Sequence, residues 1–340
     1  MRESRDTFPE TISQFPLIST IVELYCGTDK DTSLQDDDIS RLISCGLDYT
    51  LANSSWRSYC LLDLHEHLRR VQHQIVEQIS SIVAQRYKIV VSQSFAYGVL
   101  DAGAVLNGYK SDLDILVADV DMPQFKRDLA AAGHVRRVLD AETGLPIALD
   151  ETDEVDFVPG KAMAGTFLIP LNIQSFEVKT QAYIRTLAGT HQPLNINARG
   201  EAFLLYGIDA ISFYGSKPVD LDLCSLRADC SLPVQELAYN VAVAFRRLYS
   251  VVSEGILKPN LLFLICRMLK QTPLVEVERQ LEEPYKQFFH AFVWYHQAVV
   301  LTDVPWGANV ANMSDEEIEH IATFSELYSS LDEYIKLQNV

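Results

Sequence analysis

Two acidic residues at alternate positions carry the strongest chemical signal in the sequence. Asp112 and Asp114 lie in Ser111-Asp-Leu-Asp-Ile-Leu-Val117, where the apolar residues predict a short buried strand. Side chains two residues apart on a strand point to the same face, about 7 Å apart along the backbone, so both carboxylates can converge on one cation. Burying like charges together requires a counter-ion, and carboxylate oxygens suit Mg²⁺. The pattern therefore predicts a metal site, although the end of a surface strand can have the same spacing.

The segment before this strand contains small and polar residues that could contact phosphate groups. In Val90-Val-Ser-Gln-Ser-Phe-Ala-Tyr-Gly98, Ser92 and Ser94 follow a predicted strand and precede a predicted helix. Hydroxyls and backbone amides at such a turn can approach phosphate oxygens closely. Lys110 comes just before the acidic strand, where it either neutralises phosphate or is an ordinary turn residue.

Over residues 87–226 the order of these segments resembles the polymerase-β-like nucleotidyltransferase superfamily. In that superfamily a strand, a small-residue turn and a helix precede a strand that bears Asp-x-Asp. The pattern Ser-Asp-apolar-Asp-apolar-apolar-Val most resembles the antibiotic nucleotidyltransferases, of the lincosamide and aminoglycoside type, and their uncharacterised relatives. The family turn usually begins Gly-Ser or Gly-Gly, whereas this chain has Ser92-Gln93-Ser94 or, in a shifted register, Gly98-Val99. This departure leaves open which residue faces the triphosphate.

The resemblance implies a third acidic residue, set between apolar neighbours on a later strand, that completes the metal site. Asp156, in Val155-Asp156-Phe157, fits that place, and Asp153 and Glu154 are nearby alternatives. Displacement at the α-phosphorus requires a deprotonated hydroxyl beside the metal, so one carboxylate can act as both ligand and base. A solvated acid on an edge strand would show the same pattern.

The same resemblance implies a basic residue further along the chain. Residues 201–213 are predicted to form the family's helix, and Lys217-Pro-Val-Asp-Leu-Asp-Leu-Cys-Ser-Leu226 is similar to its Lys/Arg-x-x-Asp-x-x-Asp-Leu element, with the acids two apart instead of three. In relatives this basic side chain can reach the triphosphate, so Lys217 is either a ligand contact or a plain exposed lysine. Asp220 and Asp222 are expected to be structural.

Hydrophobic periodicity predicts an α/β (α+β) protein with a mixed small sheet between helical regions. The expected domains are a helical segment at 1–86, a nucleotidyltransferase catalytic domain at 87–230 and an all-helical C-terminal domain at 231–340. A helix is expected from Met122 to Gly133, and short strands are expected at His134–Leu139, Pro146–Leu149 and Glu154–Pro159 and within 166–198. Ser314-Asp-Glu-Glu317 has the pattern of a capping box at the start of a helix.

Composition limits the class of protein and of partner. With 340 residues, 48% of them hydrophobic, the chain can bury a full core. Its 46 acidic and 28 Lys+Arg residues give a formal charge of -18, which disfavours a nucleic-acid partner and suits a cationic small molecule. Six cysteines lack any C-x-x-C pair, and the sequence lacks a secretory signal and a transmembrane-length apolar run. These features predict a cytoplasmic protein that does not enter a membrane.

Together, the motifs and the resemblance predict a nucleotidyltransferase that uses Mg²⁺. The expected reaction moves NMP, most simply AMP from ATP, onto a hydroxyl of a small polar acceptor and releases pyrophosphate. Two alternatives stay open: a toxin-type enzyme that modifies a protein or tRNA, and a catalytically silent nucleotide-binding scaffold. The second alternative is motivated by the missing Gly-Ser.

Two other groups of residues are given structural interpretations. His65, His67 and His73 lie in one predicted helix. His65 and His73 could share a face of that helix, but no third ligand lies at a suitable spacing for a metal site, so the histidines are expected on the surface. The aromatic stretch Tyr285–Tyr295 has helical periodicity and is expected to pack in a core instead of stacking bases. The acceptor, the nucleobase preference and the oligomeric state do not follow from the sequence.

Overall fold

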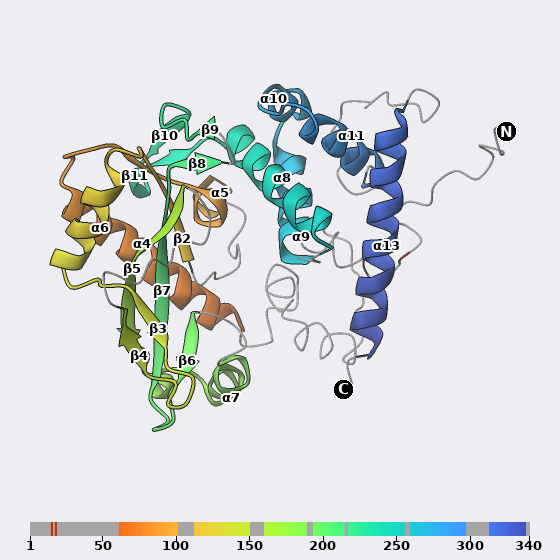
Figure 1. Ribbon diagram of the computed structural model, residues 1–340. Helices are drawn as coiled ribbons and strands as arrows, with labels where there is room; N and C mark the ends of the chain where they lie inside the picture. The colour runs from red at the N-terminus through yellow and green to blue at the C-terminus, as the bar shows by residue number, and fades with distance from the viewer. Residues whose placement is uncertain are drawn as a thin grey trace. The chain divides into compact units, whose positions relative to one another are not determined.

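The computed structural model divides the chain into two compact units, one of residues 57–236 and another that includes residues 237–340. The structure describes Phe15, Ile18 and residues 61–100, 112–149, 160–188, 193–214, 217–255, 259–296 and 313–337. Within these residues the first unit is a mixed α/β structure and the second consists of helices (Figure 1). The expected α/β class, mixed sheet and helical C-terminal region are therefore confirmed.

A mixed sheet is the framework of the α/β unit. Its strands follow the order β10-β11-β1-β2-β7-β5, and β6 also pairs with β7. Strand β2 is antiparallel to β1 and parallel to β7, and β7 is antiparallel to β5. The strand bounds are β1 Ile89–Val91, β2 Asp112–Val117, β5 Lys161–Pro170, β6 Leu194–Ile196, β7 Ala202–Ile211, β10 Cys224–Arg227 and β11 Cys230–Gln235. Because β2 and β7 have a partner on both edges, their backbones are held rigidly.

In the described part of this unit, four helices and two short hairpins accompany the sheet. Helix α4 packs against β11, α6 and α7, α5 packs against β2 and β11, and α6 packs against β5. The helices are α4 Leu61–Val83, α5 Gln93–Leu100, α6 Met122–Ala131 and α7 Val178–Leu187, with a 3-10 turn at Ile173–Ser175. The hairpins pair β3 Arg137–Leu139 with β4 Pro146–Ala148 and β8 Phe213–Tyr214 with β9 Lys217–Pro218. Leu64, Leu68, Val71 and Ile75 form the buried stripe that attaches α4 to the unit.

The helix expected at residues 201–213 is wrong, because this segment forms strand β7. It is apolar along most of its length and is buried on both faces, so neither a two-residue nor a helical period stands out. Its backbone groups pair with β2 and β6 on one edge and with β5 on the other. Tertiary pairing therefore decides the conformation of a segment whose local pattern is ambiguous.

Two other boundaries differ from expectation. Residues 178–187 form helix α7, where short strands were expected, with Ile184 fully buried. The helical region expected to begin near Leu232 begins at Leu237, because residues 230–235 pair with β1 and β10 as strand β11. Strand β2 and helix α6 lie where they were expected, with Pro123 in the first turn of α6.

The helical unit is held together by buried aromatic and aliphatic side chains. Its helices are α8 Leu237–Ser253, α9 Pro259–Gln271, α10 Leu274–Arg279, α11 Tyr285–Tyr295 and α13 Asp315–Leu337. Most of α11 is buried, which confirms that its aromatic stretch is core. The capping box is also confirmed, since the Glu317 amide donates to Ser314 Oγ and the Ser314 amide donates to the Glu317 carboxylate. None of the described helices is both long enough and apolar enough to cross a bilayer.

Candidate metal centre

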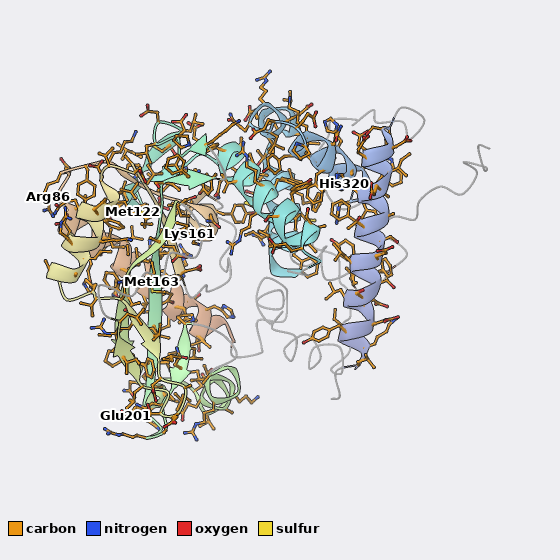
Figure 2. All side chains as sticks on the ribbon, viewed as in Figure 1. Arg86, Met122, Lys161, Met163, Glu201 and His320 are labelled. Atoms are coloured by element: carbon orange, nitrogen blue, oxygen red, sulfur yellow. The ribbon has the colours of Figure 1, made fainter. Side chains whose placement is uncertain are left out.

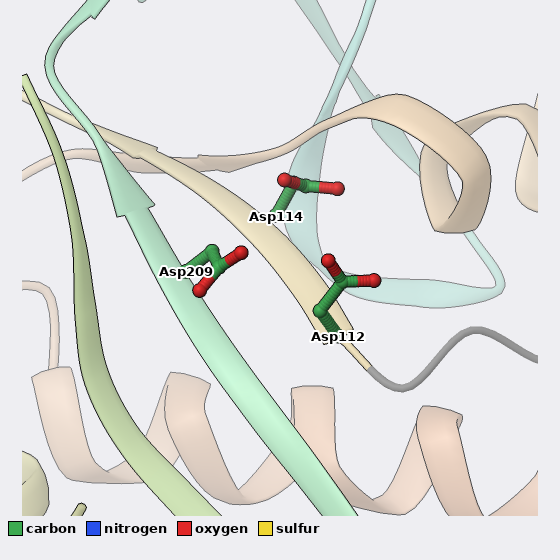
Figure 3. A group of neighbouring side chains, drawn as sticks. All are labelled: Asp112, Asp114 and Asp209. Atoms are coloured by element: carbon green, nitrogen blue, oxygen red, sulfur yellow. The ribbon is translucent and has the colours of Figure 1, made fainter. Parts of the chain in front are cut away.

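Three aspartates from two neighbouring strands meet on one face of the sheet. Asp112 and Asp114 project from β2 and Asp209 projects from β7, as Figure 3 shows. One carboxylate oxygen of each residue lies within 4.8 Å of the corresponding oxygen of the other two. Asp114 and Asp209 are buried, whereas Asp112 is partly exposed. The cluster is therefore closed on its inner side and reaches solvent at Asp112.

Strand register explains why these three side chains converge. Asp114 lies directly opposite Asp209 in the parallel ladder between β2 and β7. Asp112 precedes Asp114 by two residues, so it projects from the same face. Further along that face the pairing continues with Leu116 and Ile211, which pack with Val90 in an apolar cluster. The acidic site is thus one end of a face that becomes hydrophobic within a single pair of residues.

Lys161, the first residue of β5, supplies a positive charge to the cluster. Its Nζ atom lies 2.8 Å from Asp209 Oδ2 and 3.5 Å from Asp114 Oδ1. Burial alone would lower the pKa of Lys161, but the charges of Asp114 and Asp209 outweigh burial and raise that pKa above its ordinary value. Lys161 therefore stays an ammonium at neutral pH. Among the described residues of the cluster, three carboxylates and this one ammonium sum to two negative charges.

This donor set fits a hard divalent cation. Mg²⁺ prefers carboxylate oxygens and is commonly held by a small number of them together with substrate phosphates. Among these four described residues the two negative charges in excess equal in magnitude the charge of one such ion. The same set lacks the sulfur and imidazole ligands that favour zinc.

The turn between β1 and α5 lies against the acidic strand. The Ser92 amide donates to the Asp114 carbonyl at 2.9 Å, so the turn is tied to the backbone of β2. Ser92 Oγ is fully buried, donates to Gln235 Oε1 and lies 3.1 Å from the Tyr214 hydroxyl. Ser92 therefore supports the site from inside the protein. Ser94 lies in the first turn of α5, and its side chain is outside the described part of the structure.

The other residues nominated from the sequence fall into two groups. Lys217 lies in the short strand β9 and is exposed, and Asp222 pairs with Lys88 at 2.8 Å on the surface. Asp220 accepts a hydrogen bond from the Asp222 amide, a structural role of the kind expected for it. Lys110, Asp153, Glu154 and Asp156 lie outside the described residues, so their predicted roles stay predictions.

Asp209 was missed by the sequence analysis, although a signal for it exists. Ile208-Asp209-Ala210 has the same order of apolar, acidic and apolar residues that predicts Asp156 to be a ligand. Because residues 201–213 were predicted to form a helix, Asp209 was not among the acids expected on a strand. Lys161 has no comparable signal, since a single lysine before an apolar run is common at the start of a strand.

The three histidines of α4 form no metal site with the described residues. His65 is buried, contrary to the expectation of a surface position, whereas His67 and His73 are partly exposed. His67 contacts Phe176 and His73 contacts Phe95 through their rings. Burial lowers the pKa of both His67 and His73, so they are mainly neutral packing residues near pH 7.

Comparison with models of protein families, with curated proteins and with solved structures finds no match to this chain.

Proposed function

We propose that the protein is a Mg²⁺-dependent nucleotidyltransferase that moves NMP from a nucleoside triphosphate, most simply AMP from ATP, onto a hydroxyl of a small polar acceptor. The observation that carries this proposal is the convergence of Asp112, Asp114 and Asp209 from two adjacent central strands (Figure 3). A structural ion pair would need one acid for Lys161, whereas this site gathers three. Three carboxylate groups gathered in this way suit a hard divalent cation.

In the proposed reaction the acceptor oxygen forms a bond to the α-phosphorus while the bond from that phosphorus to the bridging oxygen breaks. Pyrophosphate leaves, and a carboxylate takes the hydroxyl proton. Asp112, Asp114 and Asp209 would hold the metal, which when bound neutralises charge on the triphosphate. Asp209 takes the place first predicted for Asp156 as the third ligand. The roles predicted for Asp156, as metal ligand or as base, stay predictions.

Backbone conformation at the β1–α5 turn supports a phosphate-binding role for that turn. Gln93 has φ +52°, a conformation that glycine adopts without strain and glutamine does not. In the superfamily that the sequence resembles, the turn begins with Gly-Ser, so Gln93-Ser94 is the pair that corresponds to it. We therefore assign the phosphate contact to Ser94 and not to the buried Ser92.

Net charge guides the choice of acceptor. A formal charge of -18 concentrates cationic ligands near the protein and repels a nucleic-acid backbone. We propose a cationic, hydroxyl-bearing small molecule as the acceptor. The toxin-type and silent-scaffold alternatives are outcomes of the test.

Pyrophosphate release from each of the four NTPs, with Mg²⁺ and a panel of hydroxylated amines, tests the proposal. Asp112→Asn and Asp209→Asn should each lower the rate by about 10²-fold or more, because losing a metal ligand costs several kcal/mol in the transition state. Glu66→Gln on the exposed face of α4 is a matched control that should leave the rate unchanged. A silent scaffold would bind nucleotide without releasing pyrophosphate. A toxin-type enzyme would release pyrophosphate when protein or tRNA is supplied as the acceptor, but not with any of the small acceptors.

A further inference from the structure

Lys161 is placed among the acids as a metal ion would be. Its Nζ atom lies within 3.5 Å of oxygens from both Asp114 and Asp209, the two buried members of the cluster. Its side chain is 23% exposed, so water screens these contacts only weakly. Figure 2 labels Lys161 on the α/β unit.

The backbone that carries Lys161 is fixed by its neighbour Gly160. Gly160 has φ +80°, and a Cβ atom there would lie 2.6 Å from Phe213 Cβ, so a larger residue does not fit. The Gly160 carbonyl accepts a hydrogen bond from the Ser212 amide at 2.7 Å. Lys161 then lies opposite Ile211 in the ladder between β5 and β7. The backbone at the start of β5 is therefore rigid, and it holds the Lys161 ammonium beside the acids.

Enzymes that use two divalent ions for phosphoryl transfer hold them about 3.5–4 Å apart, with carboxylates shared between them. Here the position between Asp114 and Asp209 already has an ammonium. A second divalent ion would have to displace that ammonium from hydrogen-bonding distance of Asp209.

We propose, resting on the proposed function, that Lys161 takes the place of a second metal ion and that the site holds one divalent cation, the one that accompanies the triphosphate. Lys161 is then a positioning residue: it fixes the Asp114 and Asp209 carboxylates and limits the number of ions. Its contacts with both acids form without nucleotide, so this part of the site is assembled before nucleotide arrives.

Native mass spectrometry can count the ions directly. The full-length protein is mixed with Mn²⁺ and an ATP analogue in which a methylene group joins the α- and β-phosphorus atoms, so that no transfer occurs. The parent should carry one Mn²⁺ and one analogue per chain. Lys161→Met, which keeps the length of the side chain and removes its charge, should carry two Mn²⁺ ions. Lys161→Arg keeps the charge and should carry one, as should Lys88→Met, a surface control whose lysine pairs with Asp222.

Two Mn²⁺ ions on the parent, or one on folded Lys161→Met, would overturn the inference. If Lys161→Met does not give the parent's circular dichroism spectrum, the counts for the parent and Lys161→Arg decide. Failure of the proposed function is distinct: the parent would then release no pyrophosphate with any NTP and acceptor. A parent that releases pyrophosphate while carrying two ions would refute the one-metal inference alone.

Discussion

Replacing Asp112 by asparagine should stabilise the protein without metal and destabilise it relative to the parent when metal is present. The neutral side chain removes repulsion from Asp114 and Asp209 while leaving both ion pairs of Lys161 in place. Active-site charges that are costly to the fold are a recognised source of opposition between stability and activity. The sign of the effect therefore tests whether the acids are gathered for a ligand.

The magnitude follows from the separation of the charges. Two unit charges about 5 Å apart repel by about 3 kcal/mol at an effective dielectric constant of about 20. Asp112 faces two such acids, Lys161 offsets roughly one of them, and the partial exposure of Asp112 weakens the remainder. We expect a net gain of about 1 kcal/mol, or about 2–4 °C in Tm for a unit of this size. Saturating metal reverses the order, since ligand at about 100 times its Kd stabilises the parent by about 2.7 kcal/mol.

Thermal unfolding followed by circular dichroism measures both effects. Samples with EDTA report the gain from removed repulsion, and samples with excess Mg²⁺ report the stabilisation by bound metal. Glu66→Gln makes the same change in net charge at an exposed position of α4 and should match the parent in both conditions. A lower Tm for Asp112→Asn in EDTA would refute the repulsion argument. An equal rise in Tm for parent and variant on adding Mg²⁺ would show that Asp112 is not a ligand.

Three further predictions concern the fold and the turn that leads into α5. Burial lowers the pKa of His296 from 6.5 to about 3, so the unfolded chain binds the extra proton between these values. Neutral His296 therefore contributes fully to the free energy of unfolding above pH 6.5, and this contribution falls by up to about 1.4 kcal/mol per pH unit below that value. When urea unfolding is measured near pH 7 and near pH 5, His296→Gln should lose less stability between the two pH values than the parent does. Asp128 accepts hydrogen bonds from Arg86 and Tyr87, and Asp128→Asn should cost about 1–3 kcal/mol in urea unfolding without changing the rate of pyrophosphate release; no change in stability would contradict this. Gln93→Gly relieves a positive φ and should raise stability by up to about 1 kcal/mol with catalysis retained or improved, whereas a loss of stability would mean that Gln93 is not strained.

Much of the fold could be predicted where local pattern and tertiary structure agree. Strand β2, helix α6 and the capping box at Ser314 each have local signals, namely a short apolar run, a proline in the first turn and a reciprocal side-chain pair. Strand β7 could not be assigned in this way, because a strand buried on both faces lacks a two-residue period. Its conformation depends on β2 and β5, which lie far away in the sequence, and on β6, which precedes it across a turn.

The site was predictable only in the part that lies within one strand. Asp112 and Asp114 are two residues apart, so their shared face follows from the geometry of a strand. Asp209 joins them through pairing across nearly a hundred residues of sequence, and Lys161 joins them through a second pairing of β7. Such long-range register is not contained in local periodicity. A more useful sequence rule here would retain every apolar-acid-apolar segment, including Ile208-Asp209-Ala210, whatever secondary structure it is assigned.

Departures from ordinary backbone and burial rules gather around this same site. Ala84 and Gln85 also have positive φ, but they follow the last residue of α4, where a left-handed conformation is a usual way to end a helix. Gln93 begins a helix instead, directly after the residue whose amide binds the Asp114 carbonyl, and no helix-ending role explains its conformation. Gly160, which also has a positive φ, directly precedes Lys161 at the start of β5. Strain of this kind persists where the surrounding structure enforces it, and it is concentrated at functional sites. Backbone strain at Gln93 and the close approach of three aspartates are independent costs, and the proposed binding of a metal with a triphosphate would account for both.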